Sequence, residues 1–452
     1  NLSTQSAVEL TGVQLPSNDF SLVGSPFPLT VEPGMSVQVT VRYAPSNEGL
    51  DDGTLILGPY DTGGGVRIPI YAGTIDPGRE QVVDFGSVLL DSQGRTPELS
   101  VSVPDDTYSL TLEGSIDSDS IFGSNIGLYS LTGPDDRVYE NGNSTGDYVW
   151  WLGTDIFTTT LPNADQPEVQ LVDGGGTYRF RLRRTAGTGA RMDVRAIIER
   201  RAPETQDYAT LDLNVWLADG ITPTASTATS DSHLQAVLTR IDDILKAQGI
   251  QLGDIDYYDV QDDKYDRVTT QTEFAEMLVT TSAASQTRLN LFFVDVAFGG
   301  GVVGVSATIS GPKVNGTSMS GVMSIYEGYS TSTIGLIAAH EIGHYVGLYH
   351  TTEQDGTHDF IDDTLECPAS GTDSVCLEDG GGYLMHWQAV GGTTITGGQG
   401  LVLRGHPLVA PAGGGVPKPF QLPMDPLALA EIMALPGNWC ATCTNGKHDH
   451  AR

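Results

Sequence analysis

The sequence predicts a multidomain protein in which two all-β sandwiches precede a mixed α/β domain. Up to about residue 205, short runs of alternating apolar and polar residues are separated by clusters of Gly, Pro, Asn and Asp. From about residue 208, segments with helical spacing of apolar residues alternate with short apolar runs. A chain of 452 residues has room for two to four domains, and we expect their boundaries at 1–76, 77–205 and 206–452.

The first two segments are built from short strands. Runs such as SVQVTVRYAP and GTLILGPY lie in residues 1–76, which resemble immunoglobulin-like sandwiches of the ASH/HYDIN type. Residues 77–205 contain YSLTLEGSI, LYSLTGPDDRVYE, GGTYRFRLRRT and ARMDVRAIIERR. Their strand and turn pattern resembles the jelly-roll domains that accompany secreted bacterial proteases. The stretch RRAPETQD, residues 200–207, predicts a linker.

The remaining segment has clear helix signals. SDSHLQAVLTRIDDILKAQG predicts a helix that Ser230 or Asp231 caps and Gly249 ends. In TTQTEFAEMLVTT, Thr270 and Glu273 have the spacing of a capping box. The apolar residues of the first helix fall on one face: Leu234, Val237, Leu238, Ile241, Ile244 and Leu245.

Strands and two further helices complete this segment. RLNLFFVDV predicts a buried strand, and GVVGVSATIS and SGVMSIY are strand candidates flanked by glycines. A third helix is expected to start near Ser332. In DPLALAEIMAL, Asp425 at the cap and Pro426 at the first helical position predict a last helix.

The charge balance excludes some partners. Lys and Arg number 23 against 57 Asp and Glu, a net charge of -34, so we expect neither nucleic acid nor an anionic membrane surface as a partner. Solubility is the favoured interpretation over a specific acidic function. No apolar run approaches the roughly 20 residues that span a bilayer. The chain starts at Asn1 without an initiator Met, and we expect an extracellular or cell-surface protein whose signal peptide has been removed.

Four cysteines lie in the last quarter of the chain: Cys367, Cys376, Cys440 and Cys443. The pair in CATC is compatible with a redox motif or half a zinc knuckle. Neither a βαβ context nor a second CxxC accompanies it. Two structural disulfides in an exported protein are therefore favoured, with three connectivities left open.

The stretch HEIGHYVGLYH carries the chemistry. His340 and His344 are four residues apart, so both imidazoles lie on one helix face and can reach one zinc ion. Glu341 lies beside the first ligand, where it can take a proton from a zinc-bound water. Gly347 permits the left-handed turn that ends a helix and returns His350 to the same metal. Three histidines leave a fourth position open, as a catalytic zinc site requires.

These five positions match HExxHxxGxxH, so the chain resembles the metzincin clan of zinc endopeptidases. The resemblance implies a tight turn with a methionine beneath the zinc, for which Met385 in GGGYLMHWQA is the candidate. Met424 is the competitor, but it precedes a helix. The resemblance also implies an edge strand that binds extended substrate through main-chain hydrogen bonds, and we place it at Gly304–Ile309.

Within the clan, TTEQDGTHDFIDDTLEC resembles the pappalysin and cytophagalysin branch. Asp359, Asp363 and Thr364 fit its Gly-Asp-x-x-x-Asp-Thr-Pro stretch, whereas Leu365 replaces the proline. TITGGQGLVLRGHP is similar to the stretch that follows the Met-turn in this branch. Trp387 stands where the branch has a tyrosine that helps to hold the transition state.

The acidic residues after the third histidine have two interpretations. Asp359, Asp362 and Asp363 could bind calcium, which takes six to eight oxygen ligands. A solvated acidic loop explains them equally well.

The resemblance thus implies a secreted zinc-dependent endopeptidase, in which Glu341 activates the water that attacks a protein or peptide substrate. The alternative is an extracellular adhesion or scaffold protein whose metzincin domain binds metal but is inactive. Cleavage specificity and oligomeric state do not follow from the sequence.

Overall fold

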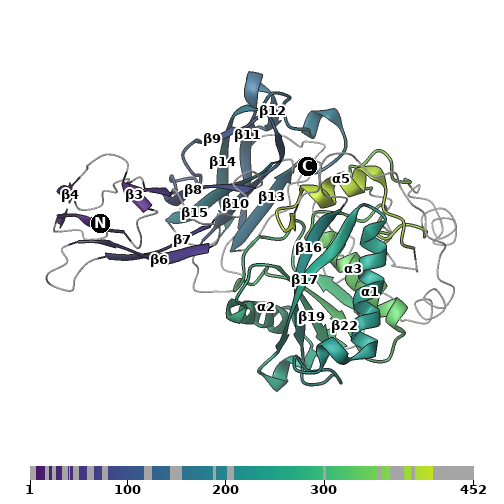
Figure 1. Cartoon of the computed structure of the whole chain (residues 1–452). Helices are drawn as coiled ribbons and strands as arrows, with labels where there is room; N and C mark the ends of the chain where they lie inside the picture. Colours follow the sequence, from purple (N-terminus) through teal and green to yellow (C-terminus); the bar gives the residue numbers. More distant parts are fainter. Residues whose placement is uncertain are drawn as a thin grey trace. The chain divides into compact units, whose positions relative to one another are not determined.

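The computed structural model is rich in β-structure and has few helices, and its chain divides into the units Asn1–Glu80 and Gln81–Arg452 (Figure 1). The four cysteines, the linker residues 201–207 and the helix expected in DPLALAEIMAL lie outside the described residues. The described residues are 7–15, 20–22, 27–32, 39, 41–43, 50–58, 66–73, 80–116, 125–142, 155–186, 190–200, 208–298, 302–353, 358–366, 381–387 and 392–410.

The first unit contains antiparallel strand pairs among its described residues. β1 pairs with β4, β3 pairs with β5, and β6 lies between β2 and β7. The strands are β1 (Val8–Leu10), β2 (Val13–Gln14), β3 (Phe20–Leu22), β4 (Leu29–Val31), β5 (Val41–Tyr43), β6 (Leu50–Leu57) and β7 (Val66–Gly73).

The second unit begins with two four-stranded sheets. One has the order β13-β10-β15-β8 and the other β12-β11-β14-β9. Alternate side chains of facing strands, such as Leu110 and Leu112 of β10 and Phe180 and Leu182 of β14, share one apolar core. The strands are β8 (Glu80–Leu89), β9 (Leu99–Val103), β10 (Thr107–Ser115), β11 (Asn125–Thr132), β12 (Val138–Glu140), β13 (Ile156–Leu161), β14 (Gly176–Ala186) and β15 (Arg191–Arg200).

A mostly parallel sheet forms the centre of the part that follows, with the order β17-β16-β19-β22-β21. β21 is antiparallel to β22 and is the last strand of this sheet among the described residues, so the predicted edge strand is present over Gly304–Ser306. The other strands are β16 (Ala209–Leu217), β17 (Ile250–Asp259), β19 (Leu289–Val294), β22 (Val322–Ile325) and β23 (Val409–Ala410), which pairs with β16. A separate short pair joins β18 (Arg267–Val268) and β20 (Val296–Ala297).

In the described residues, four α-helices accompany this sheet: α1 (Ser232–Lys246), α2 (Gln271–Val279), α3 (Thr331–Tyr345) and α5 (Gly397–Gly405). Asp231 caps α1, and the predicted capping box of Thr270 and Glu273 opens α2. α1 and α3 run side by side along the sheet (Figure 1), and Gly335 lies close against Arg240 of α1. None of the described helices has the length and apolar composition to cross a membrane.

The two parts of the second unit share interior contacts. The loop after β13 places Ala164 and Val169 in the apolar core of the α/β part. The buried Glu113 of β10 accepts a hydrogen bond from the backbone N–H of Lys313 at 2.8 Å, and Arg195 donates to the carbonyl oxygen of Lys313 at 2.7 Å. Residues on either side of the expected boundary near 205 are therefore packed together.

Candidate metal centre and active site

Helix α3 is buried over almost its whole length. Ser330 caps its start, and every residue from Thr333 to Tyr345 is buried. Gly347 follows the helix with φ +110°, a conformation that only glycine adopts readily. The N–H groups of Gly347 and Leu348 donate to the carbonyl oxygens of His344 and Gly343 at 3.0 and 2.9 Å. This turn reverses the chain and returns His350 towards the helix.

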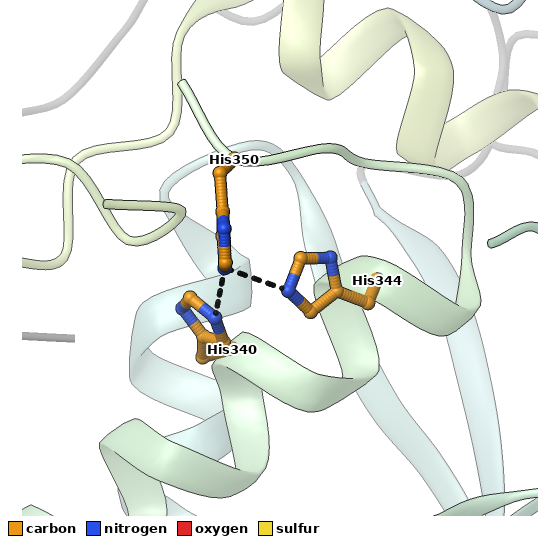
Figure 2. A group of neighbouring side chains, drawn as sticks. All are labelled: His340, His344 and His350. Atoms are coloured by element: carbon orange, nitrogen blue, oxygen red, sulfur yellow. Dashed lines mark hydrogen bonds between the residues drawn. The ribbon is translucent and has the colours of Figure 1, made fainter. Parts of the chain in front are cut away.

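The three predicted histidines meet at one point (Figure 2). Nε2 of His350 lies 3.2 Å from Nε2 of His340 and 3.1 Å from Nε2 of His344. All three residues are buried. Among the described residues, they are the one group of three His, Cys, Asp or Glu side chains that converges closely enough to hold a metal ion.

The other ring nitrogens face acceptors. Nδ1 of His340 lies 2.7 Å from the carbonyl oxygen of Leu384, and Nδ1 of His344 lies 2.7 Å from that of Leu348. Nδ1 of His350 lies 2.9 Å from Oε1 of Glu353. A carbonyl or a carboxylate can only accept, so each Nδ1 carries the hydrogen. A neutral imidazole carries only one, and the three Nε2 lone pairs therefore point at each other.

This donor set fits zinc. Three converging lone pairs repel one another unless a cation lies between them. Tetrahedral Zn–N bonds of about 2.0–2.1 Å place ligand nitrogens about 3.3 Å apart, close to the observed spacing. Burial and the neighbouring His344 and His350 rings hold the pKa of His340 well below its usual range, which keeps that ring in the neutral form that binds metal.

The side chain of Glu341 extends from α3 towards the edge strand β21. It is buried and follows the first ligand on the helix. Gly304 of β21 lies so close that a Cβ atom there would be 2.7 Å from Cγ and Oε1 of Glu341 and 2.7 Å from Cγ2 of Ile337. The absence of a side chain at Gly304 therefore makes room for the carboxylate beside the metal centre.

Met385 lies against the same helix from another side. A Cβ atom on Gly343, between the first two ligands, would be 2.6 Å from Sδ of Met385. The carbonyl oxygen of Met385 accepts the N–H of Thr351 at 2.9 Å. The segment of Leu384 and Met385 thus holds both the ring of His340 and the backbone beside His350.

The three aspartates proposed for calcium have separate partners. Oδ1 of Asp359 accepts the Thr364 hydroxyl at 2.6 Å, and Oδ2 of Asp363 accepts the N–H of Gly398 at 2.9 Å. Oδ1 of Asp362 accepts the Gln166 amide at 2.8 Å. Oδ2 of Asp359 is buried and has no hydrogen-bond partner among the described residues, and burial raises the pKa of this carboxyl to about 7.

Next to the Met-turn candidate, His386 is buried, and its desolvation lowers its pKa to about 4. Trp387 is half-buried, with its ring centroid 5.9 Å from that of His386. The stretch TITGGQGLVLRGHP contains α5, which Thr396 and Gln399 open with a capping box. Its Arg404 is buried and donates to the carbonyl oxygen of Gln248 at 2.7 Å.

Sequence reasoning missed two members of the site. Glu353 lies three residues after His350, and this spacing is the only sequence signal that the two side chains could contact each other. Leu384 could not, because it contributes a backbone carbonyl that any residue type supplies.

The fold and the three-histidine centre of the C-terminal part fit a metzincin-type zinc peptidase. The comparison with protein families agrees, because residues 209–396 match the model of metallo-peptidase family M12 (Reprolysin_5).

Among solved structures, metalloproteinase-II from Bacteroides fragilis is 19% identical, with a TM-score of 0.24, over 36% of this chain and 55% of that chain. The chain thus spans about half the length of that protein. Tripeptidyl peptidase 2 is 8% identical, with a TM-score of 0.18, over 46% of this chain and 17% of that one. The secreted serine protease VesC from Vibrio cholerae is 15% identical, with a TM-score of 0.15, over 43% of each chain. No curated protein matches significantly.

Proposed function

We propose that the protein is an exported endopeptidase in which Glu341 is the general base of a zinc-dependent hydrolysis. The observation that carries the proposal is the convergence of three Nε2 lone pairs beside a buried glutamate. His340, His344 and His350 would hold the metal. When bound, zinc polarises a carbonyl oxygen and lowers the pKa of a bound water to near 7.

Glu341 is the residue that transfers protons in this reaction. Its carboxylate takes a proton from the attacking water and delivers it to the leaving amine. Gly304 of the edge strand lies close against the carboxylate of Glu341. A carboxylate held in one place favours proton transfer, because a general base must lie within hydrogen-bond distance of the proton that it takes.

The substrate would be a protein or peptide bound in extended form along β21. That strand pairs with β22 on one side and is the last strand of the sheet order on the other. An edge strand offers backbone N–H and C=O groups to which a peptide can add as a further strand. Placement in the pappalysin branch is supported by the match of Asp359, Asp363 and Thr364 to its sequence pattern, and Thr364 donates a hydrogen bond to Asp359 at 2.6 Å.

The test is cleavage of an unfolded protein by the purified chain, with Glu341→Ala as the matched variant and Glu98→Ala, at an exposed position, as the control. We expect the wild type and the control to cleave and Glu341→Ala to lose at least about 100-fold in rate while it keeps zinc. If the wild type binds zinc but cuts no substrate, the adhesion or scaffold alternative, motivated by the β-sandwiches and by Trp387, replaces the peptidase.

The strand order of the two sheets in residues 80–200 supports a jelly-roll domain, because the chain alternates between them as in a double Greek key. We propose that this domain and the N-terminal unit place the peptidase at a surface or substrate. The cysteine pattern supports export.

We also propose that Asp359, Asp362 and Asp363 bind calcium. The proposal is supported by the buried, unbonded Oδ2 of Asp359. Calcium-dependent protection of the wild type against thermal unfolding, absent in Asp359→Asn, is the test.

A further inference from the structure

The third histidine is held differently from the other two. His340 and His344 lie on α3, and their Nδ1 atoms face neutral backbone carbonyls. His350 lies beyond the helix, after the turn at Gly347, and its Nδ1 faces the carboxylate of Glu353 at 2.9 Å. His350, the one ligand outside the helix, is thus the ligand whose Nδ1 faces a carboxylate.

A charged acceptor has a stronger effect than a carbonyl. Hydrogen bonds to ionised groups are roughly twice as strong as those between neutral groups. The His350 side chain is fully buried, whereas that of Glu353 is 21% exposed, so the carboxylate reaches the ring from the solvent side. A carboxylate on Nδ1 fixes the ring orientation and makes Nε2 a stronger metal ligand.

The local charge also favours an acidic group at this position. A divalent cation with three neutral imidazoles and the Glu341 carboxylate leaves one net positive charge in a buried site. An uncompensated buried charge is unfavourable. The Glu353 carboxylate, in contact with a ligand ring, brings the sum to zero.

We propose that Glu353 is a positioning residue that orients His350 and strengthens zinc binding through a carboxylate–histidine–zinc relay. The inference rests on the zinc site proposed above and adds a residue outside HExxHxxGxxH. Glu353 does not contact substrate in this scheme, because its effect passes through the His350 ring.

The test measures zinc affinity by competition with a chromogenic chelator. The proteins are the wild type, E353A, E353Q and the surface control E98A, all as the full chain. We expect E353A to bind zinc about 10- to 100-fold more weakly. E353Q keeps an acceptor but loses the charge, so its affinity is expected to lie between those of E353A and the wild type.

The visible spectrum of the cobalt(II)-loaded protein provides a second readout, because it reports ligand geometry. We expect the spectrum of E353A to shift and that of E98A to match the wild type. Wild-type zinc affinity in E353A would overturn the inference, and so would equal losses in E353A and E353Q. A lower melting temperature of metal-free E353A with unchanged zinc affinity would reduce Glu353 to a loop contact. A wild type that binds no zinc would instead defeat the proposed function itself.

Discussion

Replacing Gly304 with alanine tests how closely the edge strand determines the position of the base. An added Cβ would lie 2.7 Å from Oε1 and Cγ of Glu341, and 2.7 Å from Ile337. Carbon atoms in good contact are about 3.5–4.0 Å apart. Both neighbours lie on α3, so either the carboxylate or the strand must move by about 1 Å.

A displacement of that size is large for catalysis. Misplacement of a reacting group by about 1 Å can reduce the rate about 100-fold. We expect Gly304→Ala to lower kcat by about 10- to 100-fold while zinc content stays at the wild-type level, because no ligand is touched. Steady-state kinetics on a peptide substrate and zinc analysis of the same samples measure both quantities.

The matched control is Gly405→Ala. There the nearest atom to a new Cβ is Cβ of Ser109 at 3.6 Å, an ordinary contact. This variant should keep wild-type kcat. Wild-type kcat in Gly304→Ala would refute the argument, and loss of zinc would show that the substitution disturbs the ligands rather than the base.

Two further predictions concern stability. The folded protein holds the Asp359 proton up to a pKa of about 7, against 3.8 for an unperturbed aspartate, so it binds more protons than the unfolded chain across this window. The contribution of Asp359 to the free energy of unfolding should therefore fall as pH rises from about 4 to 7. Asp359→Asn should remove this contribution from the pH dependence measured by urea unfolding in calcium-free buffer, and a pH dependence identical to that of the wild type contradicts the assignment. Glu113→Ala removes the acceptor of the Lys313 N–H and the partner of Arg195. It should lower the free energy of unfolding by about 1–3 kcal/mol, and an unchanged denaturation midpoint would show that this contact contributes nothing.

The sequence predicted the parts of the site that depend on local spacing. His340, His344 and Glu341 are fixed by helical geometry, and Gly347 by the conformation its turn requires. The capping box at Thr270 was predictable for the same reason, because both partners lie within one turn.

The contacts between distant segments were not predictable. The carbonyl oxygen of Leu384 reaches His340 across 44 residues, and its role leaves no trace in residue type. The placement of Ala164 and Val169 in the α/β core is similar, since small apolar residues in a loop carry no sign of which core they join.

The position of Ala164 and Val169 has a consequence for how the protein forms during synthesis. Their loop lies within residues 80–200, whose own core can form early. The core that receives the two side chains extends to residues as late as Val409. More than half of the polypeptide is therefore synthesised between this loop and the last residues of the core that buries it. The core of the α/β part thus includes two residues, Ala164 and Val169, that are translated before its first strand, β16.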